Sequence, residues 1–192
     1  MTKLLILPGS ARRDSFNRKL AGIAATVAAE AGAAVDLVDP ADFRLPLFDQ
    51  ELEDAEGLSP NAKALKAKFL AADAIVFVSP EYNSSITPLM KNIIDWVSRT
   101  ETDDEPDLAA YRGKIAGLLS ASPGKLGGLR GLVHLRSILG NIGVLVVPKQ
   151  FSLVSAGDKF DDSGSLLSEK DVESVRGVVA EVLKVAGALR KA

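Results

Sequence analysis

Four polar residues follow the first apolar run of the chain at spacings suited to binding an anion. Ser10, Arg12, Ser15 and Asn17 lie between the expected end of a strand and the expected start of a helix. The first amides of a helix and its positive dipole end attract anions, and charge-assisted hydrogen bonds strengthen such contacts. This set predicts a phosphate cradle. The simpler alternative is a helix cap, with Ser15 or Asp14 at the N-cap position.

A second loop of chemical interest follows a later apolar run, residues 74–78. It consists of Pro80, Glu81, Tyr82 and Asn83. Thr87 and Pro88, which suit the N-cap and first positions of a helix, end the loop region. Ligands of open α/β sheets bind outside the carboxyl ends of the strands, so both loops are expected at a binding site.

Strands and helices alternate along the chain in a pattern that positions these loops. Short apolar runs predict strands at 4–7, 33–38, 74–78, 115–119 and 144–147, and helical spacing predicts helices at 15–32, 61–71, from 88 past 97, 126–142 and 168–190. This alternation predicts one α/β domain over residues 1–192, a three-layer sandwich around a parallel five-stranded sheet. Five strands favour the flavodoxin-like order 2-1-3-4-5, whose switch point lies between strands one and three, where the two loops would meet.

Two segments, 41–60 and 151–164, lack clear periodicity and are expected to be irregular. The acidic stretch 49–56 and the segment Gly124-Lys125-Leu126 match no assignable pattern, and both are expected to shape the substrate entrance. The helix that carries Trp96 has a wide apolar stripe, which predicts burial against the sheet and against a partner. Asp103, Asp104 and Glu105 are expected to be solvated surface rather than a metal site.

The composition excludes several classes of site. The chain has no cysteine and one histidine, which excludes disulfides, thiolate chemistry and histidine-rich metal sites. The net charge of −2 argues against a general nucleic-acid-binding surface. No apolar run reaches the length of a membrane span, and the first apolar run is too short for a signal peptide. A cytoplasmic protein without membrane or nucleic-acid partners is expected.

Familiar nucleotide and nucleophile motifs do not occur. The chain has no G-x-G-x-x-G after the first strand, no P-loop and no G-x-S-x-G elbow. Ser10 has no expected base partner, so a catalytic triad is not predicted. His134 falls within a helical pattern, where a structural role is expected.

Three motifs taken together resemble the NAD(P)H-dependent FMN reductase family, which has a flavodoxin-like fold and includes chromate, quinone and azo-dye reductases. They are Gly9-Ser10-x-Arg12-x-x-Ser15-x-Asn17, Pro80-Glu81-Tyr82-Asn83 with Pro88-x-x-Lys91-Asn92, and Ser122-Pro123-Gly124-x-x-Gly127-Gly128-x-Arg130. The resemblance covers most of the chain and keeps the motifs in order.

The resemblance implies a role for each matching residue. The FMN phosphate would be held by Ser10, Arg12, Ser15 and Asn17. The flavin ring and ribityl chain would be lined by Pro80, Glu81, Tyr82 and Asn83, largely through backbone groups. The other side would be closed by Ser120, Ser122 and Gly124. The helix with Trp96 would help to form a homodimer or homotetramer.

The implied activity is transfer of electrons from NADPH or NADH through FMN to a small-molecule acceptor: a quinone, chromate, an azo dye or free flavin. The flavin carries the chemistry, so no catalytic side chain and no metal are predicted. Two other readings stay open on the sequence: a flavodoxin-like electron carrier that serves a protein partner, and a nucleotide- or phosphate-binding regulator without redox chemistry.

Overall fold

The sheet has the predicted order. The protein is described by a computed structural model, which covers residues 1–190. Five parallel strands pair in the order β2-β1-β3-β4-β5. They are β1 (Lys3–Pro8), β2 (Ala34–Leu37), β3 (Ala74–Val78), β4 (Ile115–Ala121) and β5 (Leu145–Leu153). The central strands β3 and β4 are buried along their whole length, which explains their continuous apolar sequences. The flavodoxin-like prediction is confirmed.

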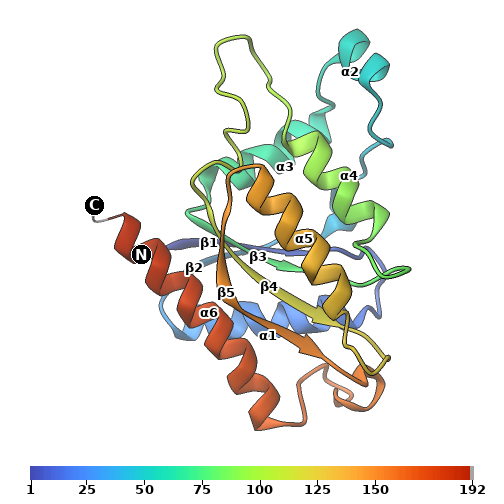
Figure 1. Cartoon of the computed structure of the whole chain (residues 1–192), viewed down its shortest axis with the longest axis vertical. Coiled ribbons are helices and arrows are strands. Elements are labelled where there is room, and N and C mark those ends of the chain that lie inside the picture. The colour runs from blue at the N-terminus through green and yellow to red at the C-terminus, as the bar shows by residue number, and fades with distance from the viewer. Residues whose placement is uncertain (191–192) are drawn as a thin grey trace.

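Helices cover both faces of the sheet and make three layers (Figure 1). On one face lie α1 (Phe16–Glu30) and α6 (Glu169–Leu189), and on the other lie α3 (Pro60–Ala71), α4 (Pro88–Val97) and α5 (Leu129–Asn141). Two short 3-10 turns occur at Pro40–Asp42 and Ala156–Asp158. As predicted, Thr87 caps α4 by accepting a hydrogen bond from the Met90 amide, with Pro88 at the first position.

Two segments expected to be irregular contain regular structure. Residues 41–60 include α2 (Gln50–Glu56), which Asp49 caps and which buries no residue. A helix without a buried face has no apolar periodicity, so the sequence pattern missed it. Strand β5 continues through Pro148 to Leu153. A register shift between Ala116 and Leu118 accompanies this, and β5 is an edge strand, where proline is tolerated.

The predicted helix at 126–142 begins later than expected. Gly127 and Gly128 have φ of 61° and 93°, and α5 starts at Leu129. A Cβ on Gly127 would lie 2.9 Å from the backbone of Ser152 and Leu153. The two glycines therefore form a close turn against β5 before the helix begins.

Trp96 is covered by the chain itself. Its indole Nε1 donates to the Pro46 carbonyl at 2.8 Å, and its ring meets Phe48 edge-on with centroids 5.1 Å apart. Asn92 holds the same segment, donating to the Pro46 carbonyl and accepting from the Phe48 amide. The outer part of the apolar stripe on α4 is thus buried by residues 45–58, so Trp96 itself offers no surface to a partner.

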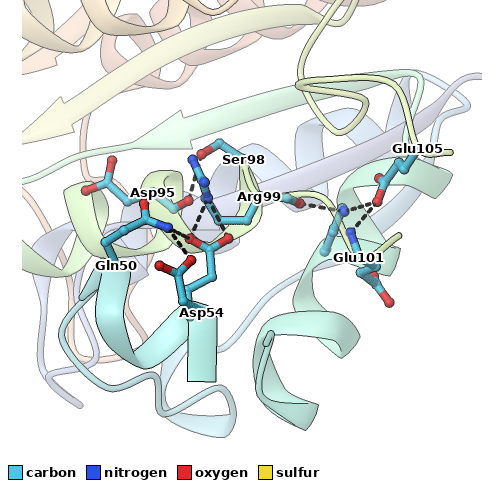
Figure 2. A network of polar contacts seen from close by, with 9 residues as sticks. Gln50, Asp54, Asp95, Ser98, Arg99, Glu101 and Glu105 are labelled. Carbon is cyan, nitrogen blue, oxygen red and sulfur yellow. Dashed lines mark hydrogen bonds and ion pairs between the residues drawn. The ribbon is translucent and has the colours of Figure 1, made fainter. Parts of the chain in front are cut away.

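A polar network joins α2 and residues 101–105 to the C-terminal end of α4 (Figure 2). The Arg99 guanidinium pairs with Glu53. The backbone carbonyl of Arg99 accepts a hydrogen bond from Lys66 Nζ at 2.6 Å. Lys66, only 1% exposed, also pairs with Glu105, which accepts from the Glu101 amide. Glu105 is therefore an anchored residue and not merely solvated surface. The acidic stretch 49–56 is held at this end of α4, away from the strand-end loops that precede Thr87.

Candidate functional site

The two polar loops predicted from the sequence do meet, at the carboxyl ends of β1 and β3. The Gly9 amide donates to the Val78 carbonyl at 2.9 Å, and the Thr87 hydroxyl donates to the Gly9 carbonyl at 2.8 Å. A Cβ on Gly9 would lie 2.9 Å from the Met90 side chain and 3.2 Å from Pro80. Glycine is therefore needed where the loops approach most closely.

A cavity of about 140 Å³ lies between these loops and the end of β4. Eight of the predicted residues line it: Ser10, Arg12, Ser15, Asn17, Pro80, Glu81, Tyr82 and Ser122. Three lining residues were not predicted: Phe16, Ala121 and Pro123. Typical small-molecule pockets have volumes of about 300–1,000 Å³, so this cavity alone has room for only part of a nucleotide-sized ligand.

The end of α1 that faces the cavity retains free hydrogen-bond donors. Ser15 occupies the N-cap position, but its hydroxyl makes no capping bond, so the amides of the first turn stay available. The Ser10 hydroxyl accepts from the Arg12 amide at 3.3 Å. The Arg12 side chain makes no ion pair with any residue in 1–190. Two hydroxyls, free amides and an uncommitted guanidinium at a helix N-terminus fit a phosphate group.

Asn17 has a different local role from the one the motif implies. Its side-chain amide donates to the Ala121 carbonyl at 2.7 Å, and its Oδ1 accepts from the Ala121 amide at 2.9 Å. The residue is only 3% exposed. Asn17 therefore joins the first turn of α1 to the end of β4, which leaves one N–H of its side chain for a ligand.

The Glu81 carboxylate binds the start of α5 rather than pointing into solvent. Its carboxylate accepts from Arg130 Nε at 2.8 Å and from the Gly131 amide at 3.1 Å. Burial raises the pKa of Glu81, but the hydrogen bonds from Arg130 and Gly131 outweigh it and hold the pKa below its usual value. Glu81 therefore caps the first turn of α5.

Tyr82 and Asn83 belong to a tight turn. The Tyr82 and Ser85 backbones exchange hydrogen bonds of 2.9 and 3.0 Å, and Asn83 and Ser84 both have left-handed φ, 49° and 66°. Consecutive left-handed residues are typical of a type I′ turn. The turn leaves Tyr82 55% exposed at the cavity rim, while Asn83 lies outside the lining.

The third predicted loop contributes less directly. Ser120 is fully buried and donates to the Gly127 carbonyl at 2.6 Å. Ser122 lines the cavity and accepts from the Gly124 amide at 3.2 Å. Ser120 and Gly124 do not line the cavity, so within this chain they shape the loop behind it.

A larger cavity of about 480 Å³ lies elsewhere, between α1, α6 and residues 163–166. It is away from the switch point and lacks the free helix amides of the smaller cavity. Within residues 1–190, no group of three or more histidine, cysteine or acidic side chains is placed to hold a metal ion, and no helix is long and apolar enough to span a membrane. We therefore assign the functional site to the smaller cavity, where the topology and the donor groups agree.

Comparison with known proteins agrees with the motifs. The model of the family described as NADPH-dependent FMN reductase matches residues 2–158. The chain belongs to the NADPH-dependent FMN reductase family. The predicted family and oxidoreductase class are confirmed, and the family description supports the predicted FMN cofactor and nicotinamide donor.

Similar proteins cover most of the chain. An NAD(P)H-dependent FMN reductase of Pseudomonas aeruginosa is 34% identical over 175 residues, 91% of this chain and 89% of the relative. A quinone reductase of Escherichia coli is 35% identical over 147 residues, 77% of this chain and 74% of the relative. The flavoenzyme NAD(P)H:(acceptor) oxidoreductase FerB from Paracoccus denitrificans aligns with a TM-score of 0.80 at 24% identity over 98% of both chains, which shows the shared fold.

Proposed function

We propose that the protein is an FMN-dependent NAD(P)H oxidoreductase that reduces small-molecule acceptors, quinones first among them. The observation that carries this is the uncapped N-terminus of α1 with Arg12 beside it, at the switch point of a flavodoxin-like sheet. The relatives named FMN reductase and quinone reductase support the reaction class. Chromate, azo dyes and free flavin belong to the same proposal as further acceptors.

The residues would divide the work of holding the cofactor. Ser10, Arg12 and Ser15 would bind the phosphate, with Asn17 mainly fixing the helix that presents it. Pro80, Tyr82 and Ser122 would border the ribityl chain and ring, together with backbone groups of their loops.

When bound, FMN would supply the redox chemistry that links oxidation of NAD(P)H to reduction of the acceptor. Hydride transfer needs no acidic or basic side chain. Glu81, the nearest carboxylate, is occupied by Arg130 and the Gly131 amide. Donor and acceptor would use one open face in turn, so ping-pong kinetics are expected. Because the reaction consumes NAD(P)H, the proposal includes a cytoplasmic location.

The proposal also includes a homodimer or homotetramer. Three apolar side chains lie exposed before and along α5: Leu126, Leu129 and, at 58% exposure, Val133. They follow the loop that borders the cavity, and the cavity is too small to enclose a flavin nucleotide alone. A second copy covering this stripe and the exposed start of α4 would bury these side chains, in place of a contact through Trp96. Val133→Glu should then yield a smaller species in size-exclusion chromatography.

Anaerobic reduction tests the proposed reaction. Addition of NADPH or NADH to the FMN-loaded protein should bleach the flavin absorbance, and benzoquinone should restore it. Bound FMN that neither donor reduces, together with a stable semiquinone on chemical reduction, would instead favour the electron carrier. No finding favours that alternative now. A protein that binds no FMN would refute both readings.

A further inference from the structure

A small hairpin after β5 packs against the helix that presents the phosphate site. Residues 159–167 follow the part of the chain that the family model matches, which ends at 158. Phe160 and Leu166 form its bridge, and the Asp161 amide donates to the Ser165 carbonyl at 2.9 Å. The Asp161 carboxylate accepts from the amides of Ser163 and Ser165, both at 2.9 Å. The hairpin thus has a defined internal structure.

Phe160 contacts α1 at two positions one turn apart. Its ring stacks on Phe16 with centroids 5.9 Å apart and planes 6° apart. Lys19 Nζ lies 5.6 Å from the centroid of the same ring. Residues three apart share a face of a helix, so Phe160 packs on the outer face of the first turn of α1. A Cβ on Gly164, across the hairpin, would lie 3.8 Å from Lys19 Cγ, so this part of the hairpin is close to the Lys19 stem.

Phe16 connects this contact to the cavity. It is the first residue of α1, it lies between Ser15 and Asn17, and it lines the cavity. The other side of the same turn is fixed by the two hydrogen bonds between Asn17 and Ala121. The turn that carries the free amides is therefore held from two sides, by β4 through Asn17 and by the hairpin through Phe160.

We propose that Phe160 is a positioning residue for cofactor binding, acting through Phe16 to fix the direction of the first amides of α1. This rests on the proposed function, in which those amides bind the FMN phosphate. Without the stack, the first turn of α1 is less ordered before FMN binds. Binding must then order this turn, which lowers the affinity of the protein for FMN. Riboflavin has the same ring and no phosphate, so its binding does not depend on Phe160.

The test measures how fast the full-length protein releases each flavin. Holoenzyme is diluted, and recovery of free-flavin fluorescence gives the release rate, once for FMN and once for riboflavin. The strength of an aromatic pair predicts that Phe160→Leu speeds FMN release about 2- to 12-fold. Riboflavin release should stay within about twofold. Phe160→Tyr, which keeps the stack, should restore the slow release of FMN.

Leu167→Ala is the matched control, because Leu167 lies in the same hairpin and is 66% exposed. It should release both flavins at the wild-type rate. Equal acceleration of FMN and riboflavin in Phe160→Leu, or no acceleration of either, would overturn the positioning role. Arg12→Ala separates this from the proposed function. If Arg12→Ala holds FMN as tightly as wild type, the phosphate site itself is misplaced, whatever Phe160→Leu does.

Discussion

Replacing Asn17 by alanine removes the link between the first turn of α1 and the end of β4. Two buried hydrogen bonds disappear, and the amide and carbonyl of Ala121 lose their partners. Each buried polar group left without a partner costs about 1–3 kcal/mol. Because Ala121 lines the cavity, entering water can partly compensate, so we expect Asn17→Ala to lower the free energy of unfolding by about 2–4 kcal/mol.

Urea unfolding of the FMN-free protein, followed by circular dichroism, measures this loss without any contribution from cofactor binding. Thr26→Ala is the matched control, because Thr26 lies on the exposed side of the same helix and bonds only to the Gly22 carbonyl one turn earlier. It should change the free energy of unfolding by less than about 0.5 kcal/mol. If Asn17→Ala is as mild as Thr26→Ala, the link does not stabilise the protein and our account of Asn17 fails.

Three further predictions test other parts of the structure. The pKa of Glu81 is lowered in the folded protein, so its carboxylate stabilises the fold above the unfolded pKa of about 4.3 and loses this effect as the pH falls through the folded value. The stability difference between wild type and Glu81→Gln, measured by urea unfolding, should therefore shrink below about pH 4. A difference independent of pH would contradict a stabilising interaction of the Glu81 carboxylate with Arg130 and the Gly131 amide. Lys66→Met should cost about 1–3 kcal/mol in the same assay, because the partly exposed Glu105 carboxylate and the Arg99 carbonyl each lose a hydrogen bond. Adding Glu105→Gln should recover part of the loss. Gly117→Ala should cost about 1–3 kcal/mol, because its Cβ would lie 2.7 Å from a valine methyl of α6, whereas Gly22→Ala, which meets no atom within 4 Å, should cost nothing.

The layers and the strand order could be predicted because apolar spacing reports burial directly. Strand β3 is an unbroken apolar run and is buried on both faces, and α6 shows its inner valines at helical spacing. Apolar spacing failed to predict elements whose buried residues do not recur at a regular interval. Helix α2 buries nothing, and β5 passes through Pro148, which usually ends a strand.

The location of the site could be predicted more reliably than the contacts that its residues make. The loops at 9–17 and 80–83 meet as the topology requires, because their residue types and strand ends are local features. The partner of Asn17 lies 104 residues away and the partner of Glu81 lies 49 away, and no local spacing encodes such pairs. Phe16 could have been included, since it stands between two predicted ligands. Ala121 and Pro123 carry no chemical signal of their own.

The most direct test of the account is the flavin content of the purified full-length protein compared with Arg12→Ala. Arg12 is exposed and makes no ion pair within the described residues, so the substitution should leave the FMN-free protein as stable as wild type. After extensive ultrafiltration, the absorbance spectrum of wild type should keep the flavin band, and Arg12→Ala should have lost it. Equal flavin retention by the two proteins, or a wild type that never binds FMN, would contradict the assignment of the cavity at the start of α1.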